Sequence, residues 1–153
     1  MKSLHLAVRQ CRMNIMIIYP DSGPRIAVAR YKWPQMALTA EKSEDPSDIV
    51  RLTCALQLES MGYYWMNNFR PWGHVILKTW DVANVQMLPW LLSCGLITET
   101  LGLVQAGYAC AKICALDIGY IADHLRHRDY DEFYLLQSQL KKEHEAYLAA
   151  LGQ

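Results

Sequence analysis

The 153-residue sequence lacks the short motifs that accompany most catalytic and nucleotide-binding sites. It contains no Gly-x-Ser-x-Gly, no Gly-x-Gly-x-x-Gly and no Gly-Lys-Ser/Thr, so neither a nucleophile elbow, a dinucleotide fold nor a P-loop is indicated. No internal repeat or low-complexity tract is present either. We therefore expect a single domain over residues 1–153 that is not an enzyme and uses no cofactor.

Long hydrophobic runs are also missing. The most apolar region, residues 82–122, is divided by charged residues and by Pro89, Gly95 and Gly102, whereas a transmembrane helix needs about 20 apolar residues in succession. Basic residues near the start of the chain interrupt any early apolar run, which argues against a signal peptide. We expect a cytoplasmic protein without a membrane partner.

The cysteines are odd in number and lie mostly in apolar sequence, which favours reduced, buried thiols over a disulfide framework. They are Cys11, Cys54, Cys94, Cys110 and Cys114. Only Lys112 supplies positive charge near the last two, and a reactive thiol needs an electropositive setting. Cys110 and Cys114 are therefore interpreted as packing residues.

The first third of the sequence has the pattern of β-strands. Residues 4–9 alternate between apolar and polar side chains, although a short helix would also suit them, and residues 13–19 and 25–33 are apolar runs joined by a turn at 20–24. Residues 74–80 resemble a further strand, and Asp81 is placed to cap the helix that follows. The sequence predicts an N-terminal antiparallel β-hairpin or small meander.

The remaining sequence has mainly helical patterns. A cap at 45–48 precedes a predicted helix that reaches about residue 67, a long central helix is expected over 96–127, and an Asp-x-x-Glu cap at Asp129 begins a final helix that stops at Gly152. Two rows of mostly small residues spaced by four indicate close contact of the central helix with another helix. The first row is Gly102, Ala106, Cys110 and Cys114, and the second is Leu103, Gly107, Ala111 and Ala115. We expect an α+β fold in which the hairpin is followed by a mainly α-helical bundle, with 1–33 β-rich and 45–153 mainly helical.

His124 and His127 are three residues apart, close to several carboxylates, and two imidazoles at that spacing can share a metal. Carboxylate-bridged di-iron sites need Glu-x-x-His pairs on two helices, and the sequence has none. We therefore predict no metal site, since polar side chains at the end of a helix are common for other reasons.

The stretch from Gly62 to His74 is unusually aromatic. Large aromatics at successive helical positions spread around the helix, so some must be difficult to bury. Two interpretations stay open, a core segment, with Trp65 as its best candidate, and a surface of the Tyr, Trp and Arg side chains that dominate binding hot spots. The second interpretation predicts a partner-binding surface formed by Tyr63, Tyr64, Asn68, Phe69, Arg70 and Trp72.

Two further contacts are predicted from pattern and charge. The final helix carries an apolar stripe from Phe133 to Leu151, which suggests a homodimer through Leu136, Leu140 and Tyr147. The net charge is zero, but the N-terminal hairpin is basic. It offers an alternative, a nucleic-acid-binding regulator that uses Arg25, Arg30 and Lys32.

In size, lack of motifs and aromatic content, the whole chain resembles the small orphan proteins of phages and mobile elements, such as anti-CRISPR inhibitors, and bacterial immunity proteins. The resemblance implies a non-enzymatic protein that occupies or masks a protein partner. This function is the leading expectation, ahead of nucleic-acid binding.

Overall fold

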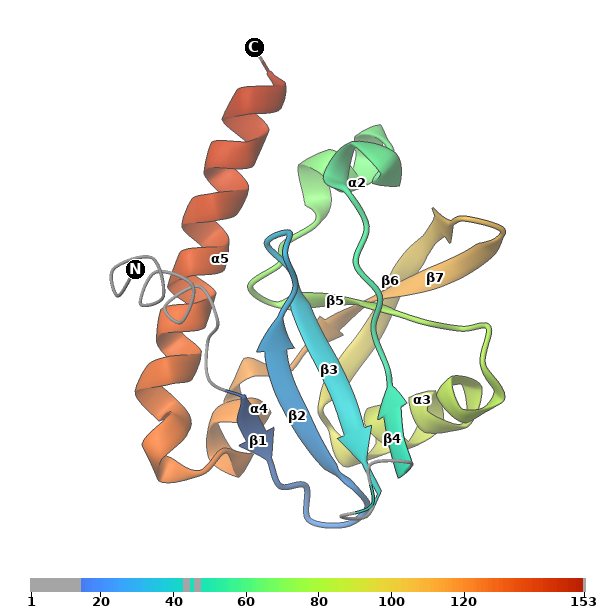
Figure 1. Ribbon diagram of the computed structural model, residues 1–153, viewed down its shortest axis with the longest axis vertical. Helices are drawn as coiled ribbons and strands as arrows, with labels where there is room; N and C mark the ends of the chain where they lie inside the picture. The colour runs from blue at the N-terminus through green and yellow to red at the C-terminus, as the bar shows by residue number, and fades with distance from the viewer. Residues whose placement is uncertain (1–14, 43–44, 46–47, 153) are drawn as a thin grey trace, which may run out of the picture.

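The computed structural model describes residues 15–42, 45 and 48–152, and these form two antiparallel sheets flanked by helices (Figure 1). The predicted N-terminal hairpin is present, but the helical bundle expected after it is wrong. Of the four further strands beyond residue 45, three lie in regions that were predicted to be helical. The expected strand over residues 4–9 and Cys11 lie outside the described residues.

The first sheet has the strand order β1-β2-β3-β4. Its strands are β1 (Met16–Ile18), β2 (Arg25–Arg30), β3 (Met36–Glu41) and β4 (Ile49–Arg51). The predicted hairpin is the β1–β2 pair, in which Met16 lies opposite Val28. Along β3, Met36, Leu38 and Ala40 are buried while the residues between them are half-buried, so one face of this sheet packs on the core and the other faces outward.

The second sheet has the strand order β5-β7-β6. Its strands are β5 (His74–Leu77), β6 (Ile97–Ala106) and β7 (Ala109–Leu116). The prediction of a strand at 74–80 is therefore confirmed for its first four residues. In β6, the register shifts twice against β7, between Ile97 and Glu99 and between Thr100 and Gly102.

The segment after β4 joins the two sheets. Thr53 forms an isolated antiparallel bridge with Leu77, and the Leu52 N–H donates to the Leu38 carbonyl at 3.0 Å. On the other side, the Cys54 N–H donates to the Ile76 carbonyl at 3.0 Å. Residues 52–54 therefore hydrogen-bond to β3 of the first sheet and to β5 of the second.

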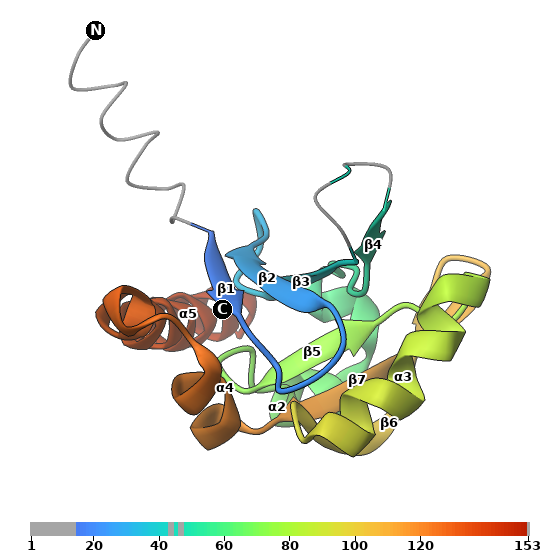
Figure 2. The same ribbon diagram turned by 90° about the horizontal axis from the view of Figure 1, so that it is seen from below.

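The helices pack against the inner face of the first sheet and against the second sheet. They are η2 (Leu58–Met61), α2 (Tyr63–Asn68), α3 (Val82–Cys94), α4 (Ile118–His124), η3 (His127–Asp129) and α5 (Tyr130–Leu151). Figure 1 shows α5 running along one side of the molecule beside β1, and Figure 2 shows α3 and α4 below the first sheet. Asp81 caps α3 as predicted, because its carboxylate accepts from the Ala83 N–H at 3.1 Å.

Two clusters of buried side chains make up the core. The larger one lies between the first sheet, one face of the second sheet and the helices α3, α4 and α5; it includes Ile26, Leu38, Val75, Leu91, Ile121, Phe133, Leu136 and Leu140. The smaller one covers the opposite face of the second sheet with η2 and α2; it includes Leu58, Met61, Trp65, Phe69, Ile76, Val104 and Ile113. The strands β5 and β7 of the second sheet therefore carry buried side chains on both faces, whereas β6 is mostly exposed.

Two predicted helices are wrong. The region 45–67 contains β4, a connecting loop, η2 and the short α2, and the region 96–127 contains the β6–β7 hairpin followed by α4. A spacing of four residues is close to one helical turn but is also twice the strand repeat of two, so it fits either structure. Gly107, counted in one of the small-residue rows, has φ +65° in the turn between β6 and β7.

The final helix is confirmed. The helix α5 begins at Tyr130 and ends at Leu151, immediately before Gly152. Asp129 stands at the predicted cap position, but its side chain makes no capping hydrogen bond. The start of this helix therefore follows from its apolar periodicity and its early acidic residues rather than from a side-chain cap.

Candidate functional site

The aromatic stretch at 62–74 forms both a core face and a surface. Trp65 is 8% exposed and Phe69 is 1% exposed, whereas Tyr63 is 84% and Tyr64 is 64% exposed. The four lie on the helix α2 and at its end, where successive residues are rotated by about 100°. The two open interpretations therefore apply to different residues, and the prediction of Trp65 as a core residue is confirmed.

Trp65 fixes α2 to the second sheet. Its indole N–H donates to the carbonyl of Leu103 on β6 at 3.2 Å. Beneath the ring lies Gly102, where an added Cβ atom would come within 2.7 Å of the Trp65 ring. The missing side chain at position 102 is thus what allows the indole to lie against β6.

The outward side of α2 is held in place by local hydrogen bonds. The Asn67 side-chain amide donates to the Tyr63 carbonyl at 2.8 Å, and that of Asn68 donates to the Tyr64 carbonyl at 2.7 Å. The Arg70 guanidinium donates to the Asn67 carbonyl at 3.0 Å. Tyr63, Tyr64, Asn68 and Arg70 are exposed, and we call these four residues the tyrosine face.

Two predicted partner-binding residues lie elsewhere. Phe69 is fully covered in the smaller core cluster, because it continues the buried side of α2 with Trp65. Trp72, which was predicted to be part of the partner-binding surface, is half-buried against the larger cluster. Arg70 and Lys141 lie 5.9 Å and 5.8 Å from the centre of its ring, so Trp72 is a packing residue between two cations.

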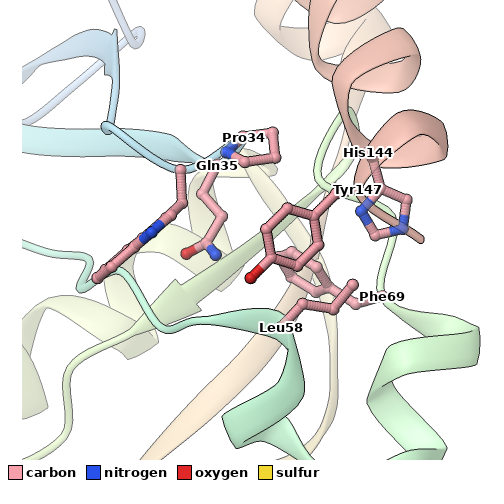
Figure 3. A pocket seen from close by; sticks show the side chains of 7 residues that line it. Pro34, Gln35, Leu58, Phe69, His144 and Tyr147 are labelled. Atoms are coloured by element: carbon pink, nitrogen blue, oxygen red, sulfur yellow. The ribbon is translucent and has the colours of Figure 1, made fainter. Parts of the chain in front are cut away.

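His144 lies next to Trp72 in a tight interior site. Its ring packs edge-on against Trp72 at 5.8 Å and against Phe69 at 6.4 Å. The pocket beside it, lined also by Gln35 and Tyr147 (Figure 3), holds about 10 Å³. That volume is the size of one water molecule, so this pocket does not suit a larger ligand.

The residues predicted to form a dimer contact pack within the chain. Leu136 and Leu140 are fully buried in the larger core cluster. Tyr147 is half-buried against the smaller cluster, and its hydroxyl donates to the Glu59 carboxylate. The apolar stripe of α5 is thus covered by the chain itself from Phe133 to Leu140, while Leu151 is exposed, and the homodimer stays a prediction without Leu136 and Leu140 to support it.

The basic hairpin is largely neutralised. Arg25 forms an ion pair with Glu41 at 3.4 Å, and Arg30 is held by both carboxylate oxygens of Glu143 on α5. Lys32 is exposed. The structure therefore does not bring the three predicted nucleic-acid-binding residues together as a set of free cations.

The histidines and cysteines of interest lie in separate places. His124 stacks on Tyr120 at 3.9 Å, and its Nε2 atom lies 3.4 Å from Asp21. His127 packs edge-on against Tyr130 instead, and no metal-binding cluster is found among residues 15–42, 45 and 48–152. Cys114 is buried as predicted, but Cys110 is exposed.

A pocket of about 480 Å³ lies over the outer face of the first sheet. Its lining comes from the end of β2, the strands β3 and β4, and the segment after β5; it consists of Arg30, Tyr31, Ala37, Thr39, Arg51, Thr53, Cys54, Lys78 and Trp80. No local sequence pattern indicates this site. Only the pairing of β3 with β4 and of Thr53 with Leu77 brings these distant positions together.

Comparisons with protein-family models, curated proteins and solved structures found no match to this chain. Of the helices in the described part of the chain, none has the length and apolar character needed to cross a membrane.

Proposed function

We propose that the protein binds a partner protein through the tyrosine face of α2. The observation that supports this proposal is the pair of neighbouring tyrosines, 84% and 64% exposed, on a helix whose other side is held by Trp65 and Phe69. Exposed Tyr and Arg side chains contribute a large share of the energy at protein interfaces. A surface that is already ordered also loses less conformational entropy on binding.

The chemistry of the tyrosine face indicates which kind of surface the partner must present. The two rings need a shallow apolar surface, their hydroxyls need hydrogen-bonding groups at its rim, and Arg70 favours a carboxylate. No reacting group is required for this contact. In this proposal the protein acts by occupying a surface of its partner, as an inhibitor does.

The test starts with affinity capture and mass spectrometry to identify a partner, followed by calorimetry with both purified proteins. We expect the Tyr63→Ala/Tyr64→Ala double variant to bind at least about 30-fold more weakly, the loss typical of a hot spot. Its unfolding midpoint should match that of the wild type, because both side chains are exposed.

Tyr134→Ala is the matched control, since Tyr134 is a 51% exposed tyrosine on α5. It should leave the affinity unchanged. Equal affinity for the double variant and the wild type would contradict the proposal, and so would an equal loss in the Tyr134 variant.

A further inference from the structure

The pocket over the first sheet carries uncompensated positive charge. Arg51 and Lys78 both line it, and within residues 15–42, 45 and 48–152 no carboxylate forms an ion pair with either. Arg30 also reaches the pocket, but Glu143 neutralises it. Of the described residues that line the pocket, none is acidic, so the pocket favours an anionic ligand.

The fold places these cations beside small side chains at the base of the pocket. Arg51 on β4 pairs with Thr39 on β3, and cross-strand partners point to the same face of a sheet. The floor beside them is formed by the small side chains of Ala37 and Thr39. An approaching group therefore meets the Arg51 guanidinium and the Thr39 hydroxyl, both hydrogen-bond donors, on the outer face of the sheet.

Trp80 forms the aromatic part of the pocket. It is 48% exposed, and the Lys78 ammonium lies 5.9 Å from the centre of its ring. A half-exposed ring can serve as a platform for another flat ring, and base stacking on aromatic side chains is largely independent of sequence. The pocket thus combines positive charge and a stacking surface within a volume typical of small-ligand sites.

The remaining polar groups point to binding rather than to catalysis. The Tyr31 hydroxyl already donates to the Thr53 carbonyl at 2.7 Å. Burial raises the pKa of the Cys54 thiol, so this sulfur stays protonated near neutral pH and is a poor nucleophile. Among the lining residues, no base or activated nucleophile is in place.

We propose that this pocket binds a nucleotide unit, with its phosphate against Arg51 and Lys78 and its base on Trp80. A phosphate accepts several hydrogen bonds at once, which suits two cations and a hydroxyl better than a single carboxylate does. The same chemistry occurs in a free nucleotide and at a position along a single strand. This site lies in the first sheet and is separate from the tyrosine face.

The test is calorimetric titration of the purified protein at low salt with adenosine monophosphate and with inorganic phosphate. We expect saturable binding of the nucleotide, and a loss of at least about tenfold in the Arg51→Gln/Lys78→Gln double variant. Trp80→Ala should weaken the nucleotide by about tenfold and leave phosphate unchanged, whereas Trp80→Phe should retain most of the affinity because it keeps a ring.

The Arg128→Gln/Lys142→Gln double variant is the matched control, because it removes two exposed cations outside the pocket. It should bind the nucleotide as the wild type does. A short single-stranded oligonucleotide that binds more tightly than the mononucleotide would support the proposal and assign the ligand to a strand; equal affinity would support it and assign a free nucleotide.

Several results would overturn the proposal. They are an absence of nucleotide binding at millimolar concentration, an equal loss in the control variant, and nucleotide affinity that does not depend on Trp80. A glutamate-rich peptide that binds this pocket more tightly than the nucleotide would show that the ligand class is wrong. Circular dichroism on each variant separates a loss of binding from a loss of fold.

Discussion

At the scale of single residues, two histidines are held in their neutral form by the fold. His144 is 3% exposed, and its Nε2 atom has no hydrogen-bond partner among the described residues. Burial lowers its pKa, and the positive charge of Arg70 lowers it further, while Glu145 acts in the opposite direction. Burial and Arg70 also lower the pKa of His74, whose Nδ1 atom accepts the Arg70 backbone N–H at 2.9 Å.

These shifts predict a loss of stability in mild acid. Because the pKa of both histidines is lower in the folded state than the ordinary value of 6.5, the unfolded chain takes up protons first as the pH falls. The contribution of these two histidines to the free energy of unfolding should be constant above about pH 7 and should decrease from about pH 6.5 towards their folded-state pKa values. Urea unfolding at pH 7.5, 6.5 and 5.5 would measure this decrease.

Replacing His144 with Leu should make that dependence on pH shallower, since an apolar side chain cannot be protonated. His127→Leu serves as the control, because His127 is exposed. An unchanged slope in the His144 variant would mean that this residue does not couple folding to pH.

At the scale of elements, the two sides of α2 contribute to different properties. The buried side contributes to stability, and the exposed side is proposed to bind a partner. Trp65→Ala should lower the free energy of unfolding by about 3–5 kcal/mol, because it removes a buried aromatic and leaves a cavity. Tyr64→Ala should change it by less than about 0.5 kcal/mol, as exposed substitutions usually do. Denaturant unfolding of both variants tests the assignment, and a Trp65 variant as stable as the wild type would mean that this side of α2 is not core.

Local sequence was sufficient for some elements and misleading for others. The hairpin β1–β2, the start of α3 at Asp81 and the extent of α5 each follow from turn residues, a cap or an apolar stripe. The β6–β7 hairpin was missed because its small residues recur at a spacing of four, which strands and helices share. The alternation of β3 was overlooked after Pro34, although Met36, Leu38 and Ala40 carry it in the sequence.

The candidate sites were predictable to different degrees. Tyr63 and Tyr64 lie beside Trp65 on α2, so their exposure follows from helical geometry once Trp65 is buried, and Arg70 lies just beyond the end of this helix. The pocket depends on strand pairing across long separations, such as Thr39 with Arg51. Such pairing is set by tertiary packing, and one sequence does not reveal it.

At the scale of the whole molecule, Thr53 links the two sheets. Its buried hydroxyl accepts the Leu38 N–H at 2.9 Å and lies 3.0 Å from the Tyr31 hydroxyl, while its backbone bridges to Leu77. Both core clusters also share the second sheet. The two sheets should therefore unfold together rather than as separate units.

Thr53→Val tests this link. The substitution keeps the shape of the side chain but leaves the Leu38 N–H without its acceptor, so it should cost about 1–3 kcal/mol of stability. Thr53→Ser keeps the hydroxyl and should cost less. Circular dichroism and tryptophan fluorescence should give one coincident urea transition for wild type and both variants; two separated transitions would contradict the shared core.

The hydrogen bond made by the Trp65 indole also affects whether the edge of a sheet can pair with another molecule. The outermost strands of a sheet expose backbone groups that can pair with another chain, and proteins that leave them bare tend to form fibrils. Here the Leu103 carbonyl of β6 is occupied by Trp65, and the two register shifts interrupt the strand. At β1, the Tyr19 N–H is occupied by the His124 carbonyl at 2.8 Å. One edge strand of each sheet is thereby made a poorer template for pairing with a neighbouring molecule.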